Sequence, residues 1–170
     1  MKVFITGGTG FLGSHICAEL DAQNIPFVAL SRSPQSDDRF VQGDLLRPET
    51  YTDHLKDCTA FIHAAGEVMH DSDSADLMWN IHVGGAKAIL EAIKESNIQR
   101  LVYLSTSGTI GVSEAEDVIS NEDSPSPFPL VKEWPYYRAK IFAEQHVLED
   151  APENLDVICL NPSLFLGPND

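Results

Sequence analysis

Short runs of apolar residues alternate along this chain with stretches in which apolar positions recur at helical spacing. The apolar runs predict buried strands at residues 2–5, 27–30, 40–41, 60–63, 101–104 and 157–160. The helical spacing predicts helices from residue 11 to residue 20 and near residues 48–57, 74–97 and 135–150. Continuous apolar strands that alternate with helices are typical of a parallel sheet covered on both faces. We therefore expect an α/β fold built on a doubly wound parallel sheet, which binds ligands at the carboxyl ends of its strands.

The longest predicted helix, 74–97, has an apolar face that we expect to be buried, formed by Leu77, Ile81, Ala88, Ile89 and Ile93. The segment from Ser113 to Pro135, in contrast, is rich in acidic residues and proline. Loops of this length in compact domains are usually functional or disordered. Because this one leads from strand 101–104 into the next helix, we expect a flap that overhangs the ligand crevice on the substrate side. A solvated acidic loop is the alternative.

The first strand runs directly into a glycine-rich turn and then into a helix. Gly8, Gly10 and Gly13 satisfy the G-x-G-x-x-G fingerprint, and Gly7, Gly10 and Gly13 give an equally spaced variant. Glycines let the backbone turn sharply and approach a ligand closely. The unpaired N–H groups and the positive end of the helix dipole suit a diphosphate. The turn therefore predicts dinucleotide binding in a nicotinamide-dependent enzyme, and a glycine-rich turn without a ligand is the alternative.

Composition narrows the possible partners. A chain of 170 residues suits one domain, residues 1–170, and its 43% hydrophobic content is ordinary for a globular protein. The net charge of −15 argues against a nucleic-acid partner and against docking on anionic membranes. The acidity is explained more simply by a highly soluble surface.

The patterns of cysteine, histidine and hydropathy argue against a disulfide-linked, metal-binding, membrane-spanning or secreted protein. Cys17, Cys58 and Cys159 lie far apart in apolar or helical contexts, which favours reduced core thiols of an intracellular protein. The six histidines show no metal-type spacing, so no metal site is expected. No apolar stretch is long enough to span a membrane, and no signal peptide precedes the first strand. The expected location is the cytoplasm.

Tyr136 and Lys140 are candidates for acid–base chemistry, because residues four apart on a helix share one face. Pro135 suits the first helical turn, which sets Tyr136 at the helix start beside the crevice. A phenol has a pKa of about 10, so lowering it by about three units requires roughly 4 kcal/mol of preference for the phenolate. A nearby ammonium and an oxidised nicotinamide both favour the phenolate. Chance pairing of a packing tyrosine with a surface lysine is the alternative.

Hydroxyl groups follow strand 101–104 at Ser105, Thr106 and Ser107. One of them can donate to a substrate oxygen and hold it against Tyr136. A simple Ser/Thr turn is the alternative, because these residues commonly satisfy loop backbone.

The glycine turn, the Tyr136–Lys140 pair and the hydroxyls after strand 101–104 together resemble the extended short-chain dehydrogenase/reductase family, the NAD(P)-dependent epimerase/dehydratase group. The matching segments are Thr6–Gly13, Gly43–Leu45, His63–Gly66, Asn80–Gly85, Leu104–Ser107, Tyr136–Lys140 and Asn161–Pro168. The resemblance implies a Rossmann-type fold and four catalytic residues, Ser107, Tyr136, Lys140 and Asn80. It also implies that Asp44 bonds the adenine amino group, that the His63–Gly66 loop lies under the adenosine ribose and diphosphate, and that Asn161–Pro168 passes the nicotinamide.

We expect the cofactor to contact Gly7, Gly8, Thr9, Gly10, Phe11, Leu12, Gly13, Ser31, Arg32, Asp44, Leu45, His63, Ala64, Ala65, Gly66, Ser105, Tyr136, Lys140, Pro162 and Ser163. For NAD, an acidic residue would be expected about twenty positions beyond the glycines, where it bonds the ribose 2′-hydroxyl. Here the second strand ends in Ser31-Arg32-Ser33. Arg32 with these hydroxyls can accept a 2′-phosphate, which favours NADP(H). A solvated Arg32 with NAD bound is the alternative.

The family normally continues into a small domain that closes over the substrate, so we expect this chain to be truncated before that domain. Gly108-Thr109 stands where the family's sugar-nucleotide dehydratases carry an acidic pair. This difference disfavours elimination chemistry. The expected reaction is therefore reduction of a carbonyl or epimerisation through a transient ketone, and the expected substrate is a small carbonyl or alcohol compound or a nucleotide sugar. A non-catalytic redox sensor and an inactive cofactor-binding stub are the alternatives. The resemblance also implies a possible homodimer through the helices at 74–97 and 135–150.

Overall fold

The protein is described by a computed structural model, in which residues 1–69, 74–115 and 117–168 are placed well enough to describe. The sheet contains β1 (Val3–Thr6), β2 (Phe27–Ser31), β3 (Phe40–Gln42), β4 (Ala60–His63), β5 (Arg100–Leu104) and β6 (Asp156–Leu160). The strand order is β3-β2-β1-β4-β5-β6, and every pairing is parallel. The predicted parallel α/β sheet is therefore confirmed, with the order reversing between β1 and β4.

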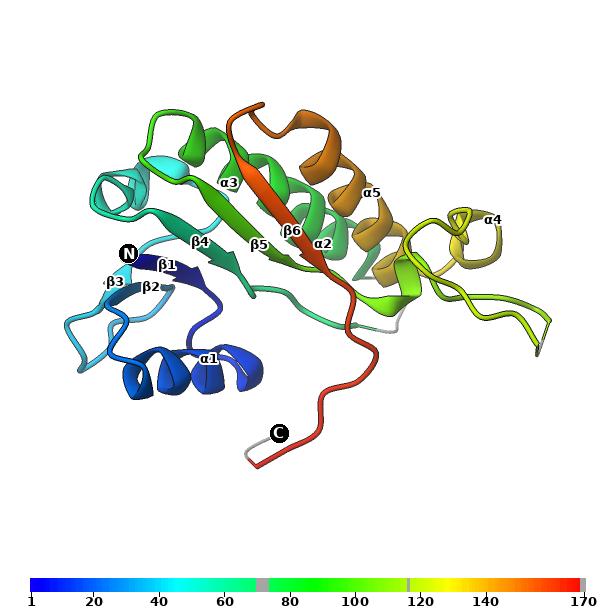
Figure 1. Cartoon of the computed structure of the whole chain (residues 1–170), viewed down its shortest axis with the longest axis horizontal. Helices are drawn as coiled ribbons and strands as arrows, with labels where there is room; N and C mark the ends of the chain where they lie inside the picture. Colours follow the sequence, from blue (N-terminus) through cyan, green and yellow to red (C-terminus); the bar gives the residue numbers. More distant parts are fainter. Residues whose placement is uncertain (70–73, 116, 169–170) are drawn as a thin grey trace.

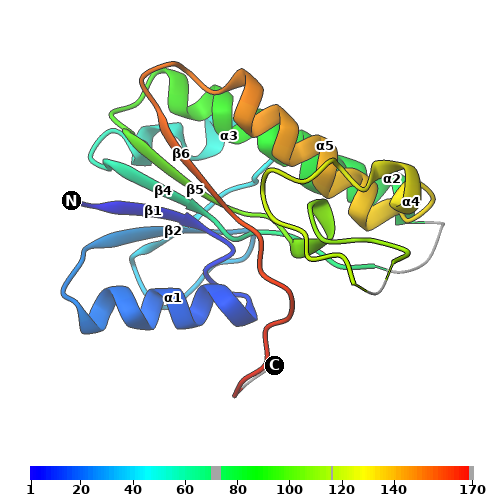
Figure 2. The same cartoon turned by 45° about the vertical axis from the view of Figure 1, so that its right-hand side comes forward.

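Helices lie against both faces of the sheet (Figure 1). On one face lies α1 (Phe11–Ala22), over a small core that includes Val3, Ile5 and Cys17. On the other face lie α2 (Ala75–Trp79), α3 (Gly85–Lys94) and α5 (Pro135–Asp150). Figure 2 shows the same two layers from a turned viewpoint. The larger core lies beneath the second layer, where Phe4, Phe61 and Leu101 of the sheet meet α3 and α5.

The predicted helix at 48–57 is wrong in type. The segment forms two short 3-10 helices, η1 (Pro48–Thr50) and η2 (Thr52–Leu55). Threonine hydroxyls bond the local backbone here: Thr50 Oγ1 donates to the Arg47 carbonyl (2.7 Å) and Thr52 Oγ1 to the Pro48 carbonyl (2.6 Å). Such local bonds compete with a regular α-helix.

The predicted helix at 74–97 is interrupted. A π-helical turn, η4 (Asn80–Gly84), separates α2 from α3, and α3 ends at Lys94. A π turn contains an extra residue, so it rotates the preceding residues around the helix axis. The predicted buried face therefore holds for Ala88, Ile89 and Ile93 but fails for Leu77, which is 47% exposed. Ile81 is half-buried.

The acidic, proline-rich segment contains one short helix, α4 (Phe128–Val131). Figures 1 and 2 show it projecting from the molecule beside the start of α5, near the carboxyl ends of the strands. A role for it as a flap over a ligand remains a prediction.

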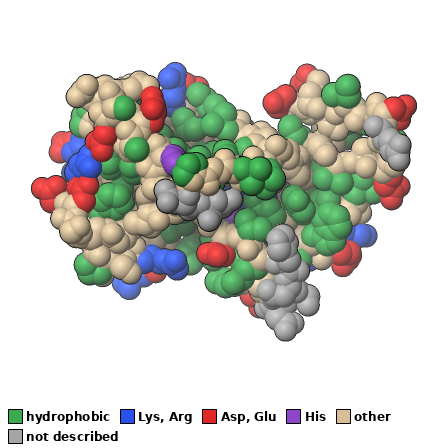
Figure 3. Space-filling view, turned by 90° about the horizontal axis from the view of Figure 1, so that it is seen from below, with side chains coloured by type: hydrophobic (Ala, Val, Ile, Leu, Met, Phe, Trp, Pro, Cys, Tyr) green, Lys and Arg blue, Asp and Glu red, His purple; other side chains and the backbone are tan. Residues whose placement is uncertain are grey.

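The prediction that helices cover both sheet faces is incomplete for β6. Ile158 and Leu160 of this strand are exposed on the face of the sheet that carries α1, because α1 packs over β1 and β2 and leaves β6 uncovered (Figure 1). An apolar hollow of about 540 Å³ lies between this part of the sheet and α1, lined by Leu12, Ile16, Ile62, Val102, Leu104, Leu160, Asn161, Pro162 and Phe165. In the view from below, hydrophobic side chains cover much of the middle of the molecule, and most acidic side chains lie toward its ends (Figure 3).

Candidate active site at the carboxyl edge of the sheet

The glycine turn is built by close backbone packing. Gly7 has a φ of +80°, and a Cβ there would lie 2.6 Å from the backbone of Ala64. A Cβ on Gly13 would overlap the carbonyl oxygen of Gly7. Gly8 is also buried, against Ala29. These glycines let the start of α1 lie directly on the turn, which brings the helix N-terminus to the carboxyl end of β1.

The outer part of the turn is open. Thr9 and Gly10 are exposed, Phe11 and Leu12 are half-buried, and Gly10 caps α1 without a side-chain hydrogen bond. The first turn of α1 has no acidic residue that would compete for its N–H groups. Backbone N–H groups and a positive dipole end that face an open crevice suit an anion. The residues present therefore fit a dinucleotide diphosphate.

The end of β2 holds the candidate group for a 2′-phosphate. Ser31 is buried, and its hydroxyl donates to the carbonyl of Ser33 (2.7 Å). Arg32 is exposed, and its carbonyl accepts a bond from Gln42 Nε2 (3.3 Å). None of the ion pairs among the described residues involves the Arg32 guanidinium. The Arg32 guanidinium is therefore available to an anionic ligand, whereas the Ser31 hydroxyl is already hydrogen bonded to the Ser33 carbonyl.

Asp44 and Leu45 follow β3. Asp44 is exposed, and its Oδ1 accepts a bond from the Leu46 N–H (2.9 Å). A methyl group of Leu45 lies against Gly85, 2.9 Å from where a Cβ would stand. Asp44 thus keeps an outward carboxylate oxygen for a donor such as an amino group, and Leu45 helps anchor this loop on α3.

His63 lies in the core instead of facing a ligand. It is 1% exposed, its Nδ1 is hydrogen bonded to Thr6 Oγ1 (2.7 Å), and its ring stacks on Tyr103. Burial lowers the pKa of His63 to about 3, so the ring is neutral at physiological pH. The His63 side chain therefore faces the core, and the place of the His63–Gly66 loop under the adenosine ribose and diphosphate stays a prediction. The partly exposed residues after it, Ala64 to Gly66, stay candidates at the crevice.

Lys140 projects from α5 to the end of β5. Its ammonium donates to the carbonyl of Leu104 (2.6 Å) and lies over the Tyr103 ring. The side chain is 4% exposed, and burial lowers the pKa of Lys140 to about 8 although the Glu144 charge opposes the shift. A single carbonyl satisfies only one of the three ammonium donors. The remaining donors are available for a ligand hydroxyl.

Tyr136 stands one turn before Lys140 and is half-buried. Burial raises the pKa of Tyr136, while a side-chain hydrogen bond from Thr106 acts in the opposite direction. The lowered phenol pKa that the Tyr–Lys spacing suggested is therefore not a property of the chain by itself. Here the cost of burying a phenolate prevails, and Tyr136 is a neutral phenol that can donate a proton.

The strand end after β5 gives its three hydroxyls different surroundings. Ser105 Oγ is buried and has no hydrogen-bond partner among the described residues. Thr106 caps η5 (Ser107–Thr109) and contacts Tyr136. Ser107 is half-buried; its N–H donates to the Pro162 carbonyl (2.8 Å), and its carbonyl accepts from the Gly111 N–H (2.7 Å). The Ser107 hydroxyl is therefore held on a fixed backbone beside the crevice, which suits a substrate-positioning role.

A catalytic role for Asn80 stays a prediction. Its side chain is exposed on the π turn. His82, two residues later, is 2% exposed, packs edge-on against the Tyr136 ring and donates from Nε2 to the Glu67 carbonyl (2.9 Å). Sequence reasoning missed His82, although its spacing to the buried Ala86 and Ile89 carries the signal.

The segment after β6 completes the site. Pro162 is half-buried against Ser107, and Ser163 is exposed. Asn161 donates from Nδ2 to Glu144 Oε2 and Thr109 Oγ1, both at 2.8 Å. Sequence reasoning missed Glu144, although it continues the four-residue spacing of Tyr136 and Lys140. The carboxyl ends of the six strands thus carry the candidate groups, apart from Tyr136 and Lys140 of α5 and Asn80 of η4.

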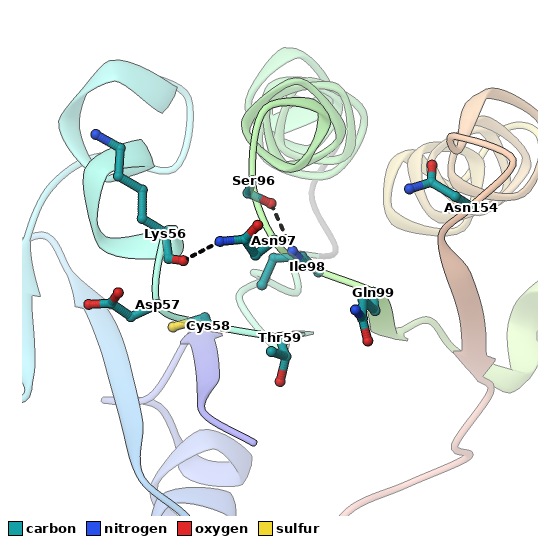
Figure 4. Close-up of a pocket in the computed structure, with 9 residues that line it drawn as sticks. All are labelled: Lys56, Asp57, Cys58, Thr59, Ser96, Asn97, Ile98, Gln99 and Asn154. Atoms are coloured by element: carbon teal, nitrogen blue, oxygen red, sulfur yellow. Dashed lines mark hydrogen bonds between the residues drawn. The ribbon is translucent and has the colours of Figure 1, made fainter.

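A second hollow, of about 530 Å³, lies at the opposite edge of the sheet (Figure 4). It is lined by the residues that precede β4, β5 and β6: 56–59, 96–99 and 154. Two of its polar side chains are tied into the local turns, because Asn97 Nδ2 donates to the Lys56 carbonyl (2.6 Å) and Ser96 Oγ accepts from the Ile98 N–H (3.2 Å). Parallel sheets of this order bind ligands at their carboxyl edge. We therefore do not assign a ligand to this hollow.

Other kinds of site find no support in the residues that the structure describes. They contain no cluster of three or more His, Cys, Asp or Glu side chains that could hold a metal ion. Their cysteines are free, with Cys17 and Cys58 buried and Cys159 partly exposed. No helix within these residues is long and apolar enough to cross a membrane.

Comparison with known proteins gives a consistent result. A model of the NAD dependent epimerase/dehydratase family matches residues 3–170. The chain is 32% identical to a 2-alkyl-3-oxoalkanoate reductase of Shewanella oneidensis, over 98% of this chain and 45% of the relative. The chain spans about half the length of the curated relatives it matches.

Two solved structures show the same fold. The yeast methylglyoxal/isovaleraldehyde reductase complexed with NADPH superposes with a TM-score of 0.81 at 22% identity, over 96% of this chain and 58% of that one. The Thermus thermophilus UDP-glucose 4-epimerase in complex with NAD gives 0.77 at 24% identity, over 95% and 54%.

Proposed function

The chain belongs to the NAD dependent epimerase/dehydratase family, and from this premise we propose that residues 1–170 are the NAD(P)-binding domain of a reductase or epimerase acting on a carbonyl or alcohol carbon. One observation carries the proposal. Lys140, bonded to the Leu104 carbonyl, and Tyr136, one helical turn before it and in contact with His82, lie at the sheet edge that also bears the glycine turn. An acid–base pair beside a dinucleotide crevice is the equipment that hydride exchange at a carbonyl requires.

The turn at Gly7–Gly13 would hold the diphosphate through the N–H groups of α1, and Asp44 would accept from the adenine amino group. Lys140 would donate to a hydroxyl of the nicotinamide ribose with the ammonium protons that Leu104 leaves free. When bound, a nicotinamide dinucleotide supplies hydride exchange with the substrate carbon. The exposed, unpaired Arg32 supports NADP(H) in preference to NAD, because a guanidinium binds phosphate oxygens well.

In this proposal Tyr136 moves the proton and Ser107 positions the substrate oxygen. Because burial keeps the phenol protonated, Tyr136 is set to donate to an oxygen that gains negative charge during reduction. The fixed backbone of Ser107 allows its hydroxyl to hold that oxygen within reach. In the reverse direction, removing the alcohol proton needs the phenolate, which the Lys140 ammonium would stabilise.

The expected substrate is a small carbonyl or alcohol compound or a nucleotide sugar. The similarity to a 2-alkyl-3-oxoalkanoate reductase supports a carbonyl substrate, and the similarity to a UDP-glucose 4-epimerase supports a nucleotide sugar. We also propose that the protein works in the cytoplasm, which its free cysteines support.

We further propose a homodimer through the outer faces of α2 and α5. Trp79 and Phe142 lie in contact across these helices (5.3 Å between ring centroids), and Phe128 of α4 packs on Phe142. Several large apolar side chains of this region are exposed, namely Leu77, Trp79, Leu130, Trp134, Phe142 and Leu148. Exposed apolar surface of this extent is typical of an interface. Sedimentation of the chain as a monomer at micromolar concentration would contradict this part.

Tyr136→Phe tests the catalytic proposal in the protein at its natural length. The variant keeps the ring that packs against His82 and loses only the hydroxyl. We expect turnover to fall at least about a hundredfold, because general acid–base catalysis is worth this much. Tyr137→Phe, on the next residue of α5, is the matched control and should retain activity. Turnover of Tyr136→Phe within about threefold of wild type would overturn the assignment.

A further inference from the structure

Glu144 extends the row of polar residues on α5 beyond the two that the proposed function uses. It follows Lys140 by four residues, as Lys140 follows Tyr136. Glu144 Oε2 accepts two hydrogen bonds, from Thr109 Oγ1 (2.9 Å) and from Asn161 Nδ2 (2.8 Å). Thr109 ends η5, and Asn161 directly follows β6. One carboxylate oxygen thus joins α5 to the segments that follow two neighbouring strands.

These two segments together hold the turn that carries Ser107. The single Thr109 hydroxyl proton is shared between Glu144 Oε2 and the Thr106 carbonyl (2.8 Å), and Asn161 Nδ2 lies 3.3 Å from the same carbonyl oxygen. The Ser107 N–H donates to the Pro162 carbonyl, one residue beyond Asn161 (2.8 Å). Both polar groups of the Thr106–Ser107 peptide are therefore held: the carbonyl by Thr109 and Asn161, which are themselves bonded to Glu144, and the N–H by Pro162, the residue after Asn161.

We propose that Glu144 is a positioning residue of this site, which fixes the Ser107 hydroxyl relative to Tyr136 by fastening η5 and the β6 exit to α5. This inference rests on the proposed function. Tyr136, Lys140 and Glu144 belong to one rigid helix, whereas Ser107 belongs to a short turn. Loss of the carboxylate leaves Thr109 and Asn161 bonded only to each other and to the Thr106 carbonyl, with no hydrogen bond to α5, so the turn can shift relative to the helix. A displacement of about 1 Å in a reacting group can cost about a hundredfold in rate.

Three substitutions separate positioning from charge and from general stability. Glu144→Gln keeps an acceptor oxygen of the same reach but removes the negative charge. Glu144→Leu removes both the acceptor and the charge. Val147→Ala is the matched control on the same helix: Val147 is fully buried in the core, so this change opens a cavity and lowers stability away from Thr109 and Asn161.

The first measurement needs no turnover. Hydrogen exchange of the Asn161 side-chain amide, followed by NMR in the chain as it stands, reports directly on its bond to Glu144. We expect exchange at least about tenfold slower than for an exposed asparagine such as Asn121 in wild type and in Glu144→Gln, and faster exchange in Glu144→Leu, where the Asn161 amide keeps only its bonds to Thr109 and Thr106. Exchange in wild type as fast as that of Asn121, or exchange in Glu144→Leu as slow as in wild type, would overturn the inference.

The second measurement is turnover of the natural-length protein, together with its NAD(P)H affinity. We expect Glu144→Leu to lower kcat at least about tenfold with the cofactor Kd within about threefold of wild type, and Glu144→Gln and Val147→Ala to retain kcat within about threefold. An unchanged kcat in Glu144→Leu, or an equal loss in Glu144→Gln or Val147→Ala, would overturn the inference. Failure of Tyr136→Phe to impair turnover would instead refute the proposed function, and the amide exchange would still report on the Glu144 bond.

Discussion

Lys140 Nζ donates a 2.6 Å hydrogen bond to the main-chain carbonyl of Leu104, so the ammonium of α5 is fixed at the last residue of β5. This bond sets the Tyr136–Lys140 pair at the carboxyl edge of the sheet. It also holds a cation in a position that is 4% exposed, and burial lowers the pKa of Lys140 to about 8. A site-forming contact of this kind costs stability, because a charge is removed from water.

The buried ammonium predicts a pH-dependent difference in stability between wild type and Lys140→Met. The folded pKa of about 8 lies below the ordinary value of 10.5, so between these values the unfolded chain binds the proton more tightly. Wild type should therefore gain stability relative to Lys140→Met as the pH rises from about 8 to 10.5, by up to about 3 kcal/mol. Urea unfolding at several pH values measures this. The control is Lys87→Met, which changes an exposed lysine on α3; its free energy of unfolding should differ from that of wild type by the same amount at every pH. A difference between Lys140→Met and wild type that does not change with pH would contradict the prediction.

Gly13 and Gly10 should respond differently to alanine. A methyl group at Gly13 overlaps the Gly7 carbonyl, whereas at Gly10 its nearest neighbour, the same oxygen, lies 3.3 Å away. We expect Gly13→Ala to lower the free energy of unfolding by about 1–3 kcal/mol through overpacking. Gly10→Ala should stay within about 1 kcal/mol of wild type while weakening NAD(P)H binding at least tenfold, because the methyl group faces the open crevice. Thermal unfolding and fluorescence titration check both, and unimpaired binding by Gly10→Ala would contradict the account of the crevice.

Arg32→Ala tests the choice of cofactor. The exposed guanidinium is the group that we propose to bind a 2′-phosphate, and NADH has no such phosphate. The substitution should weaken NADPH binding at least about tenfold and leave NADH binding within about threefold, because hydrogen bonds to charged groups contribute about 1.5–3 kcal/mol. Arg47→Ala, which removes an exposed cation paired with Glu49, is the control. Equal losses for the two cofactors, or none, would favour NAD.

His82 predicts a stability loss in mild acid. Burial lowers the pKa of His82 to about 4 from an ordinary 6.5. As the pH falls from 6.5 toward 4, the unfolded chain takes up a proton that the folded chain does not, so stability is lost across this window. His82→Phe keeps a ring against Tyr136 and removes this titration. Between pH 6.5 and 4 the free energy of unfolding should fall in both proteins, and we expect the fall to be smaller in the variant by up to about 3 kcal/mol.

Chemical denaturation at pH 7, 5.5 and 4.5 measures the His82 effect. His54→Phe, which replaces an exposed imidazole on η2, should follow wild type through the series. Parallel loss of stability in wild type and His82→Phe would contradict the prediction.

Periodicity and glycine spacing predicted the strands, α1 and α5 within one or two residues, because buried parallel strands and a turn without side chains leave strong local signals. The π turn at Asn80–Gly84 has no such signal, since it depends on packing against α5. Its consequence, that Leu77 is exposed, could therefore not be predicted from uniform helical spacing, whereas the spacing of His82 to Ala86 and Ile89 does indicate that His82 is buried. The two 3-10 helices that begin at Pro48 likewise depend on hydrogen bonds from threonine hydroxyls to nearby backbone carbonyls, which the apolar pattern does not predict.

The candidate site was predicted as a set of residues but not as a network. Tyr136, Lys140 and the hydroxyls after β5 do meet at one edge, as their spacing and the strand order require. The contacts that link them, from Lys140 to a carbonyl and from Glu144 to Thr109 and Asn161, join segments far apart in the chain. Such contacts arise from the registry of β5 and β6 against α5, which no local pattern specifies.

Equilibrium titration of the folded chain with NADPH and with NADH tests the central claim most directly. The glycine turn, the bare N–H groups of α1 and the Lys140 ammonium together predict saturable binding with a Kd between about 1 µM and 1 mM, the range typical for enzyme ligands, and tighter binding of NADPH. A folded chain that binds neither dinucleotide at millimolar concentration would contradict the account.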